Sequence, residues 1–143
     1  MTDKLLAELD STDENVRARA AVELHKQGHE MALEACLRTL NDAPDALHAD
    51  RTPSVACLIE IGELALGPLL DRLASEDRVT RMHAERAVQG ITRRRFGFDG
   101  IAWPPGAMER WMDWWSGIGF DSGDAAPGRA AAIERLRGGI RAT

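Results

Sequence analysis

The chain of 143 residues contains no tyrosine, and aromatic residues make up only 5% of it. It also lacks any run of the roughly 18 uncharged apolar residues that a membrane-spanning helix needs. Asp3, Lys4 and Glu8 interrupt the apolar residues at the N-terminus, so no signal-peptide core is present there. We therefore expect a cytoplasmic protein with no membrane span.

Cysteine is scarce as well, with only Cys36 and Cys57 in the chain. Two cysteines cannot form the disulfide framework of a small secreted domain. Both lie on apolar stripes of expected helices in neighbouring repeat units. The sequence therefore predicts two buried thiols that pack in a core rather than a cysteine nucleophile.

The residues that are abundant favour a globular helical domain. Apolar residues make up 44% of the chain and charged residues 29%, and alanine and leucine dominate the apolar set. The net charge of −5 is uneven, because residues 1–71 carry 6 Lys/Arg against 14 Asp/Glu and residues 72–143 carry 12 against 9. An acidic chain is poorly suited to non-specific nucleic-acid binding, which depends on neutralising phosphates.

Apolar residues recur along the chain with a period of 33–34 residues. Leu24, Leu58 and Ile91 are separated by 34 and 33 residues, and the segments that begin at Glu30 and Glu63 match at an offset of 33. Because each period contains two apolar series, the pattern is typical of an array of helical hairpins.

Within each period the apolar residues follow helical spacing. Val16, Ala20, Ala21 and Leu24 form one stripe, which Ser11, Thr12 or Asp13 can cap at its start. Residues 41–52 have no clean stripe and are expected to form a long, partly helical connection. The expected helices cover residues 13–27, 30–40, 53–62, 63–74 (bent at Pro68), 78–95, 105–116 and 127–140.

A motif at residues 13–24 recurs in part at residues 76–91. In the second copy Val79 is followed by Thr80, so Arg81 comes one position later than the arginine of the first copy. The two copies read Asp13-Glu14-Asn15-Val16-Arg17 with Ala20, Ala21 and Leu24, and Glu76-Asp77-Arg78-Val79 with Ala84, Ala87, Val88 and Ile91.

This motif resembles the HEAT repeat family, in particular the short HEAT-like repeats first associated with phycobilisome lyases. A hairpin of two such helices cannot bury both of its apolar faces, so successive hairpins must stack. The resemblance predicts an all-α, right-handed α-solenoid of about four helical hairpins. Residues 1–95 form its HEAT-like repeats, and residues 96–143 form Trp-rich capping helices of the same solenoid domain.

The cap is expected from the aromatic residues after a Gly/Pro-rich passage at residues 97–106. Met108, Trp111, Met112 and Trp115 recur at helical steps, so they are interpreted as one face that covers the open end of the solenoid. Trp114 lies at the margin of this face. We treat it as a candidate partner anchor, because tryptophan is enriched at binding hot spots.

HEAT arrays serve mostly as scaffolds, so the resemblance implies a non-enzymatic protein-protein interaction module that binds a protein or peptide. Helical phase predicts that its groove is lined by solvent-facing residues of the repeats. The candidate partner-binding residues are Arg19, Glu23, Lys26, Arg51, Glu60, Arg86 and Trp114.

Three other functions are open at this stage. In the first hypothesis the chain is an accessory subunit of a lyase-type or DNA-repair enzyme. In the second it associates with itself through its unequally charged ends. In the third hypothesis the chain binds nucleic acid through a basic zone, which is formed by Arg78, Arg81, Arg86, Arg93, Arg94 and Arg95.

We do not expect enzymatic activity, since the chain has no nucleophile elbow, P-loop or dinucleotide fingerprint. HEAT-like DNA glycosylases need a basic concave surface with a catalytic carboxylate, and Glu23, Glu60 and Glu85 have no distinguishing context. The HEAT-like deoxyhypusine hydroxylase binds iron through repeated His-Glu dipeptides, of which this chain has only His29-Glu30. We therefore expect no metal and no cofactor.

Overall fold

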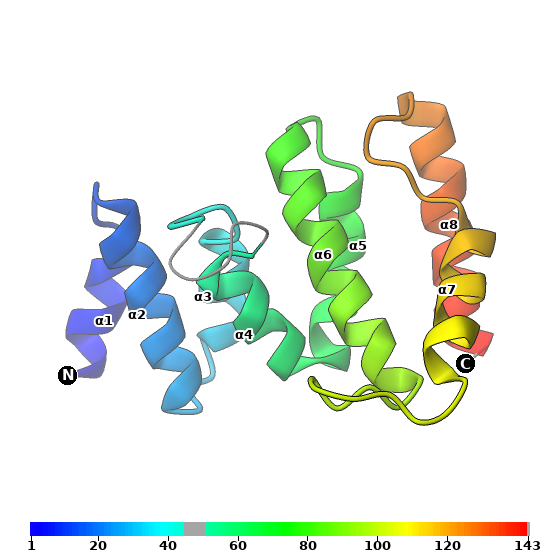
Figure 1. The fold of residues 1–143 in the computed structure, drawn as a ribbon. Helices are drawn as coiled ribbons and strands as arrows, with labels where there is room; N and C mark the ends of the chain where they lie inside the picture. Colours follow the sequence, from blue (N-terminus) through cyan, green and yellow to red (C-terminus); the bar gives the residue numbers. More distant parts are fainter. Residues whose placement is uncertain (45–50, 143) are drawn as a thin grey trace. The chain divides into compact units, whose positions relative to one another are not determined.

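The computed structural model describes residues 1–44 and 51–142, and within these ranges the chain forms helices and contains no β-strand (Figure 1). The prediction of an all-α fold is therefore confirmed. In the same ranges no helix combines the length and the hydrophobicity needed to cross a bilayer. The helices are α1 (Thr2–Glu8), α2 (Glu14–Lys26), α3 (Ala32–Arg38), α4 (Pro53–Ile61), α5 (Glu63–Leu73), α6 (Arg78–Arg95), α7 (Ala107–Ile118) and α8 (Ala126–Ala142).

The chain divides into two compact units, Met1–Pro68 and Leu69–Thr143. The division falls inside α5, next to Pro68, which is the residue that removes one helical hydrogen bond there. The boundary expected after residue 95 lies within the second unit and stays a prediction.

Helix starts follow the caps that the sequence contains. The Asp13 carboxylate accepts the N–H of Asn15, and the Thr52 hydroxyl accepts the N–H of Val55 ahead of the proline that begins α4. Each cap satisfies a backbone donor that has no partner in the helix. The bounds of α6 agree with the expected helix at residues 78–95.

Two differences from the expected helices have local causes. α3 begins at Ala32 instead of Glu30, because the Met31 N–H donates to Nδ1 of His29 and extends the turn that follows Gly28. α1 was not expected. Its Leu5 is buried, and so is Leu9 immediately after it, so these two residues fix this short helix on the core.

The connection between α3 and α4 is described at its two ends. Asp42 accepts two hydrogen bonds from the Arg17 guanidinium, at 2.8 and 3.0 Å, and Ala43 adopts a positive φ of 48°. The central part of the expected connection, residues 45–50, lies outside the described residues.

The segments 11–17 and 75–81 make the same contacts at the starts of α2 and α6. In each, the serine hydroxyl accepts the aspartate N–H at 3.1 Å, and the aspartate carboxylate caps the helix. The arginine guanidinium then donates back to the serine carbonyl, at 2.8 Å from Arg17 and 2.9 Å from Arg81. By its contacts, Arg81 is the counterpart of Arg17, 64 residues earlier, although sequence comparison places it one position late.

In the first unit, α2 packs against α1, α3 and α4, and α3 also packs against α4. Leu24 and Leu58 are fully buried in this core. A polar seam accompanies them, in which the Thr39 and Ser54 hydroxyls lie 2.6 Å apart in a buried hydrogen bond. Cys36 and Cys57 are free and buried, which confirms the prediction of two packed thiols.

In the second unit, α7 packs against both α6 and α8. Ile91 of α6 and Leu136 of α8 are fully buried. The last turn of α5 lies beside α8, where the Arg137 guanidinium is 3.6 Å from the Asp71 carboxylate. This unit holds all four tryptophans of the chain.

Candidate functional site

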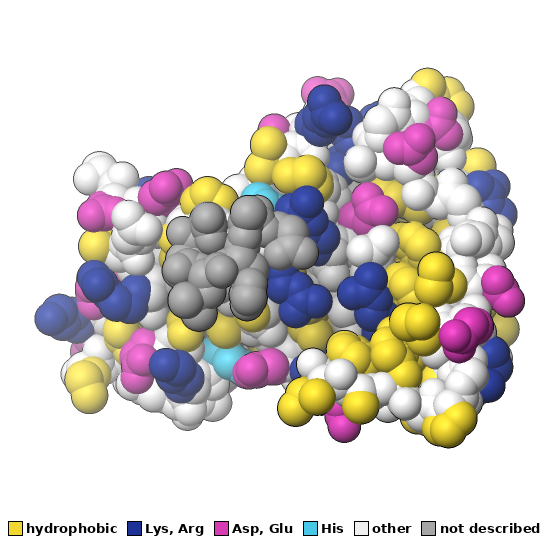
Figure 2. Space-filling model, in the orientation of Figure 1, with side chains coloured by type: hydrophobic (Ala, Val, Ile, Leu, Met, Phe, Trp, Pro, Cys, Tyr) yellow, Lys and Arg dark blue, Asp and Glu magenta, His cyan; other side chains and the backbone are white. Residues whose placement is uncertain are grey.

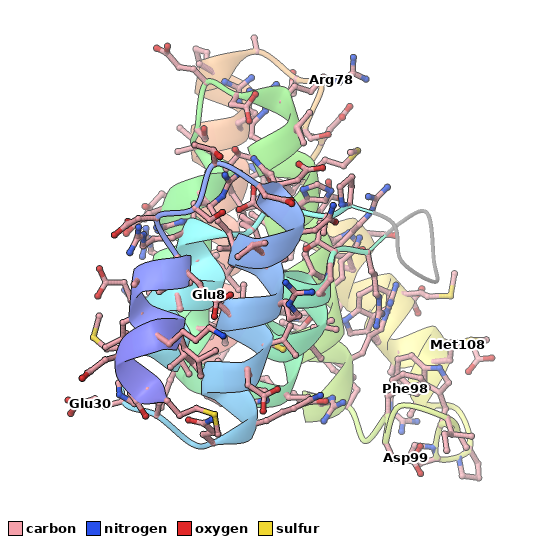
Figure 3. The ribbon with its side chains drawn as sticks, turned by 90° about the vertical axis from the view of Figure 1, so that its left-hand side faces the viewer. Glu8, Glu30, Arg78, Phe98, Asp99 and Met108 are labelled. Atoms are coloured by element: carbon pink, nitrogen blue, oxygen red, sulfur yellow. The ribbon has the colours of Figure 1, made fainter. Side chains whose placement is uncertain are left out.

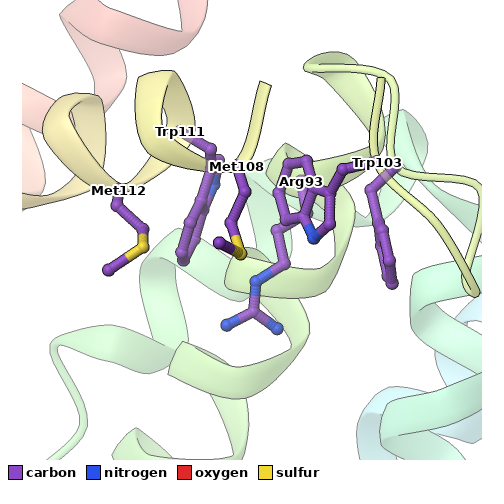
Figure 4. A pocket seen from close by; sticks show the side chains of 6 residues that line it. Arg93, Trp103, Met108, Trp111 and Met112 are labelled. Carbon is purple, nitrogen blue, oxygen red and sulfur yellow. The ribbon is translucent and has the colours of Figure 1, made fainter. Parts of the chain in front are cut away.

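The second unit contains a hydrophobic pocket where the end of α6, the connection 96–106 and α7 meet. Its volume is about 270 Å³. Figure 2 shows hydrophobic side chains gathered in this region, and Figure 4 shows the side chains at close range. The lining residues are Arg93, Phe98, Trp103, Met108, Trp111 and Met112.

The connection that carries Phe98 and Trp103 is held by the close approach of Gly97 to Pro104 and by the side chain of Asp99. Gly97 has φ 101°, and a Cβ added there would come 2.7 Å from Cγ of Pro104, so only glycine fits. The Asp99 carboxylate accepts the N–H groups of Ala102 and Ile101, each at 2.8 Å, and these bonds lower the pKa of Asp99.

Trp111 forms the floor of the pocket and is 5% exposed. Its Nε1–H donates to Oγ1 of the fully buried Thr92 at 3.0 Å, and the Thr92 hydroxyl donates to the Val88 carbonyl at 2.9 Å. The Arg93 guanidinium lies over the indole, 4.4 Å from the ring centroid. Trp111 is therefore fixed at both its edge and its face.

The aromatic side chains around Trp111 form a continuous cluster. Ring centroids are 4.9 Å apart between Phe98 and Trp103, 6.3 Å between Trp103 and Trp111, and 5.9 Å between Trp111 and Trp115. The last pair is stacked, with an interplanar angle of 13°. These separations lie in the range of favourable aromatic contacts, so the cluster supplies a rigid wall.

The open side of the pocket carries flexible apolar side chains. Met108 and Met112, one helical turn apart on α7, are 43% and 52% exposed, and Ile101 nearby in the chain is exposed as well. In Figure 3, Phe98 and Met108 lie near each other within the second unit, in agreement with their shared pocket. Contiguous exposed apolar surface of this kind is typical of interaction sites.

Trp114, the candidate anchor, lies beside this pocket and does not line it. It is half-buried, with its ring 5.6 Å from Phe96 and 6.3 Å from Trp115. A Cβ added to Gly139 would come 3.1 Å from Cζ2 of Trp114, so the indole packs closely on α8. Its partner-binding role stays a prediction.

Sequence reasoning missed Phe98 and Trp103, because it assigned residues 97–106 to a Gly/Pro-rich connection. The available signal was the pair of bulky aromatic residues in a segment that, apart from Ile101, otherwise consists of small and turn-forming residues. Their convergence with α7 depends on the backbone turn at Gly97, which helical periodicity does not describe.

The other candidate partner-binding residues are divided between the units. Arg19, Glu23 and Lys26 share one face of α2, and their side chains are exposed or half-buried. The locations of the rest are Arg51 ahead of α4 (half-buried), Glu60 on α4 (exposed) and Arg86 on α6 in the second unit (half-buried). The groove that these residues were expected to line stays a prediction.

Glu60 makes one further contact within the first unit. Its carboxylate lies 2.7 Å from Nε2 of His25 on α2. In the described parts of the chain, no three His, Cys, Asp or Glu side chains lie together as a metal-ligating cluster. A cavity of about 330 Å³ beside this pair is lined by His25, Gly28, His29, Glu30, Ala32, Leu33, Ile61 and Leu64.

Several arginines of the expected basic zone make contacts inside the second unit. The Arg81 side chain is buried and donates to the carbonyls of residues 75, 76 and 122. Arg93 lies over Trp111, and Arg95 donates to the carbonyl of Ile140. These three guanidinium groups therefore have structural roles in the packing of α6.

A carboxylate on the same helix is partly desolvated. Burial, together with the nearby Asp121, raises the pKa of Glu85. Its Oε2 lies 3.4 Å from the side-chain amide of Gln89.

Comparison of the chain with protein-family models, with curated proteins and with solved structures finds no match.

Proposed function

We propose that this protein is a non-enzymatic interaction module that binds a short segment of a partner protein in the pocket of the second unit. The observation that carries the proposal is the pair of exposed methionines, Met108 and Met112, above the fixed indole of Trp111. The occupant that fits is an apolar side chain of the partner, inserted between the methionines and the aromatic wall.

The rigidity of the wall supports this function. Trp111 is already held by Thr92 and Arg93, so binding does not need to order it and little conformational entropy is lost. Methionine side chains adapt to ligands of different shape, because they are unbranched and polarizable. The volume of about 270 Å³ lies just below the range of about 300–1,000 Å³ that is usual for small-molecule sites. It suits one or two side chains better than a cofactor.

We further propose that the helices belong to a HEAT-like α-solenoid that presents this pocket at its capped end. The supporting observation is the set of contacts shared by segments 11–17 and 75–81. A helix start with the same cap and the same arginine contact in both units is what a repeat array requires, because each repeat is one copy of the same supersecondary unit.

Selection of displayed random peptides against the full chain tests the binding function. We expect enriched peptides to share a large apolar residue and to quench tryptophan fluorescence, because Trp103 and Trp111 line the pocket. In anisotropy titrations, Met112→Glu is expected to weaken binding at least about tenfold, since it places a charge at an apolar contact.

A matched control is Val79→Glu, which changes an exposed apolar residue in the first turn of α6, outside the pocket. It is expected to leave the affinity of the peptides unchanged. Enriched peptides that bind Met112→Glu as tightly as the unsubstituted chain would contradict the proposal, as would a selection that enriches no apolar motif.

A further inference from the structure

The hydroxyl pair between α3 and α4 defines the register of these two helices. Oγ of Ser54 lies 2.6 Å from Oγ1 of Thr39, and both residues are fully buried. Cys36 precedes Thr39 by three residues, and Cys57 follows Ser54 by three residues. The end of α3 meets the start of α4. The residue one turn before Thr39 therefore lies opposite the residue one turn after Ser54. The same register therefore brings the two thiols face to face.

The electrostatics of the two thiols agree with this register, because the Cys36 and Cys57 side chains each shift the pKa of the other. Sγ of Cys36 also lies 4.0 Å from the carbonyl oxygen of Ala21 on α2. Cys36 is fully buried, whereas Cys57 keeps 7% of its surface exposed. A small solute therefore reaches Cys57 first.

The surroundings distinguish the two sulfur atoms further. The Cys36 side chain lowers the pKa of Cys57, and nearby His25 and Lys26 act in the same direction, whereas burial and the Glu60 carboxylate oppose this lowering. The interaction with Cys57 and burial raise the pKa of Cys36. Cys57 has the properties of an attacking thiol, and Cys36 those of a resolving thiol.

We propose that Cys36 and Cys57 form an oxidative modification site, at which a small peroxide converts the two thiols into an intrachain disulfide that joins α3 to α4. The inference goes beyond peptide binding and rests on the first unit alone.

The reaction proceeds in two balanced steps with hydrogen peroxide. The Cys57 thiolate attacks one peroxide oxygen, the O–O bond breaks, and the leaving hydroxide takes up the thiol proton to give water and a sulfenic acid. The Cys36 sulfur then attacks the Cys57 sulfur. The S–S bond forms, the S–O bond breaks, and the hydroxyl group leaves with the Cys36 proton as a second water. One peroxide is reduced, and two thiols are oxidised.

The test treats the folded, full-length chain with a small excess of hydrogen peroxide, denatures it, and titrates its thiols. We expect both thiols to disappear, with an intact mass lower by about 2 Da because two hydrogen atoms are lost. Non-reducing peptide mapping should recover the peptides of Cys36 and Cys57 as one cross-linked species, which dithiothreitol separates. The oxidised chain should also unfold at a higher urea concentration than the reduced chain.

Two alanine variants test the roles of the sulfur atoms, and circular dichroism checks their folding first. Cys57→Ala should leave the Cys36 thiol unreacted at the same peroxide dose. Cys36→Ala should gain oxygen at Cys57, because no resolving thiol remains.

The measurement on the unsubstituted chain decides the proposal even where a variant fails to fold. Two thiols that still titrate after treatment would overturn the proposal. A chain that gains oxygen atoms without a cross-link, or one that forms only disulfide-linked dimers, would overturn it as well.

Discussion

The indole Nε1–H of Trp111 donates a 3.0 Å hydrogen bond to the hydroxyl of Thr92, a residue with no exposed surface one helix away. The same hydroxyl donates to the Val88 carbonyl at 2.9 Å. One threonine on α6 thus positions the most buried of the three tryptophans of α7. This bond places the floor of the proposed binding pocket.

Thr92→Val is expected to destabilise the protein by about 1–3 kcal/mol, because it leaves the buried indole donor of Trp111 without an acceptor. Urea unfolding measures this loss. In the folded protein, hydrogen exchange of the Trp111 indole should become faster. Thr92→Ser is the matched control, since it loses a methyl group but keeps the hydroxyl. Equally slow indole exchange in the valine and serine variants would show that the bond does not position Trp111.

Gly97→Ala is expected to destabilise the chain by about 1–3 kcal/mol, because the residue has φ 101° and its added Cβ would clash with Pro104. Gly117→Ala should instead stabilise it by about 0.5–1 kcal/mol, since this glycine is inside α7 with open space around it. Thermal unfolding compares the two variants. Similar changes in melting temperature would contradict the assigned backbone geometry.

The protein should lose stability in acid partly through Asp77. Hydrogen bonds from Thr80 lower the pKa of Asp77 below the usual value of 3.8. The folded state therefore favours the carboxylate, so this stabilisation is present above pH 3.8 and is lost as the pH falls through the folded-state pKa.

Asp77→Asn isolates this contribution, because asparagine still caps the helix but does not titrate. Its melting temperature should fall less steeply than that of the unsubstituted chain between neutral pH and strong acid. Glu76→Gln removes the neighbouring carboxylate instead and serves as the control. If the asparagine variant follows the steep profile of the unsubstituted chain, Asp77 is not the titrating group.

Ser54→Ala is expected to cost about 1 kcal/mol, because it removes a hydrogen bond of 2.6 Å between α3 and α4. A double-mutant cycle with Thr39→Val should give a coupling free energy of at least about 0.5 kcal/mol, as for residues in direct contact. Additive effects in urea unfolding would mean that the two hydroxyls do not interact, and would remove the register on which the cysteine pairing rests.

Local sequence signals were sufficient to predict most of the helices. Asp13, Thr52 and Asp77 cap α2, α4 and α6, because a polar side chain before an apolar stripe satisfies backbone donors wherever the helix packs. The burial of Leu24, Leu58 and Ile91 likewise follows from their helical spacing. The stacking of hairpins into a solenoid stays a proposal.

Contacts between residues far apart in the chain were beyond these signals. Periodicity predicts which face of a helix is buried, but it does not predict which residue of another helix faces it. It therefore gave Cys36 and Cys57 as two separate buried thiols, whereas the Thr39–Ser54 bond shows the register that pairs them. The equivalence of Arg81 and Arg17 has a different origin, because both arginines donate to a serine carbonyl six residues earlier, and alignment on Val16 and Val79 does not use this spacing.

Caps and apolar stripes act over a few neighbouring residues, so the starts of α2, α4 and α6 and their apolar faces could be predicted from the sequence. The pocket that Phe98 and Trp103 form with α7, and the packing of Trp114 on α8, depend instead on contacts between segments distant in the chain. The positive φ of Gly97 and the hydrogen bond from Trp111 to Thr92 set that arrangement. Both depend on how separate segments approach one another in space.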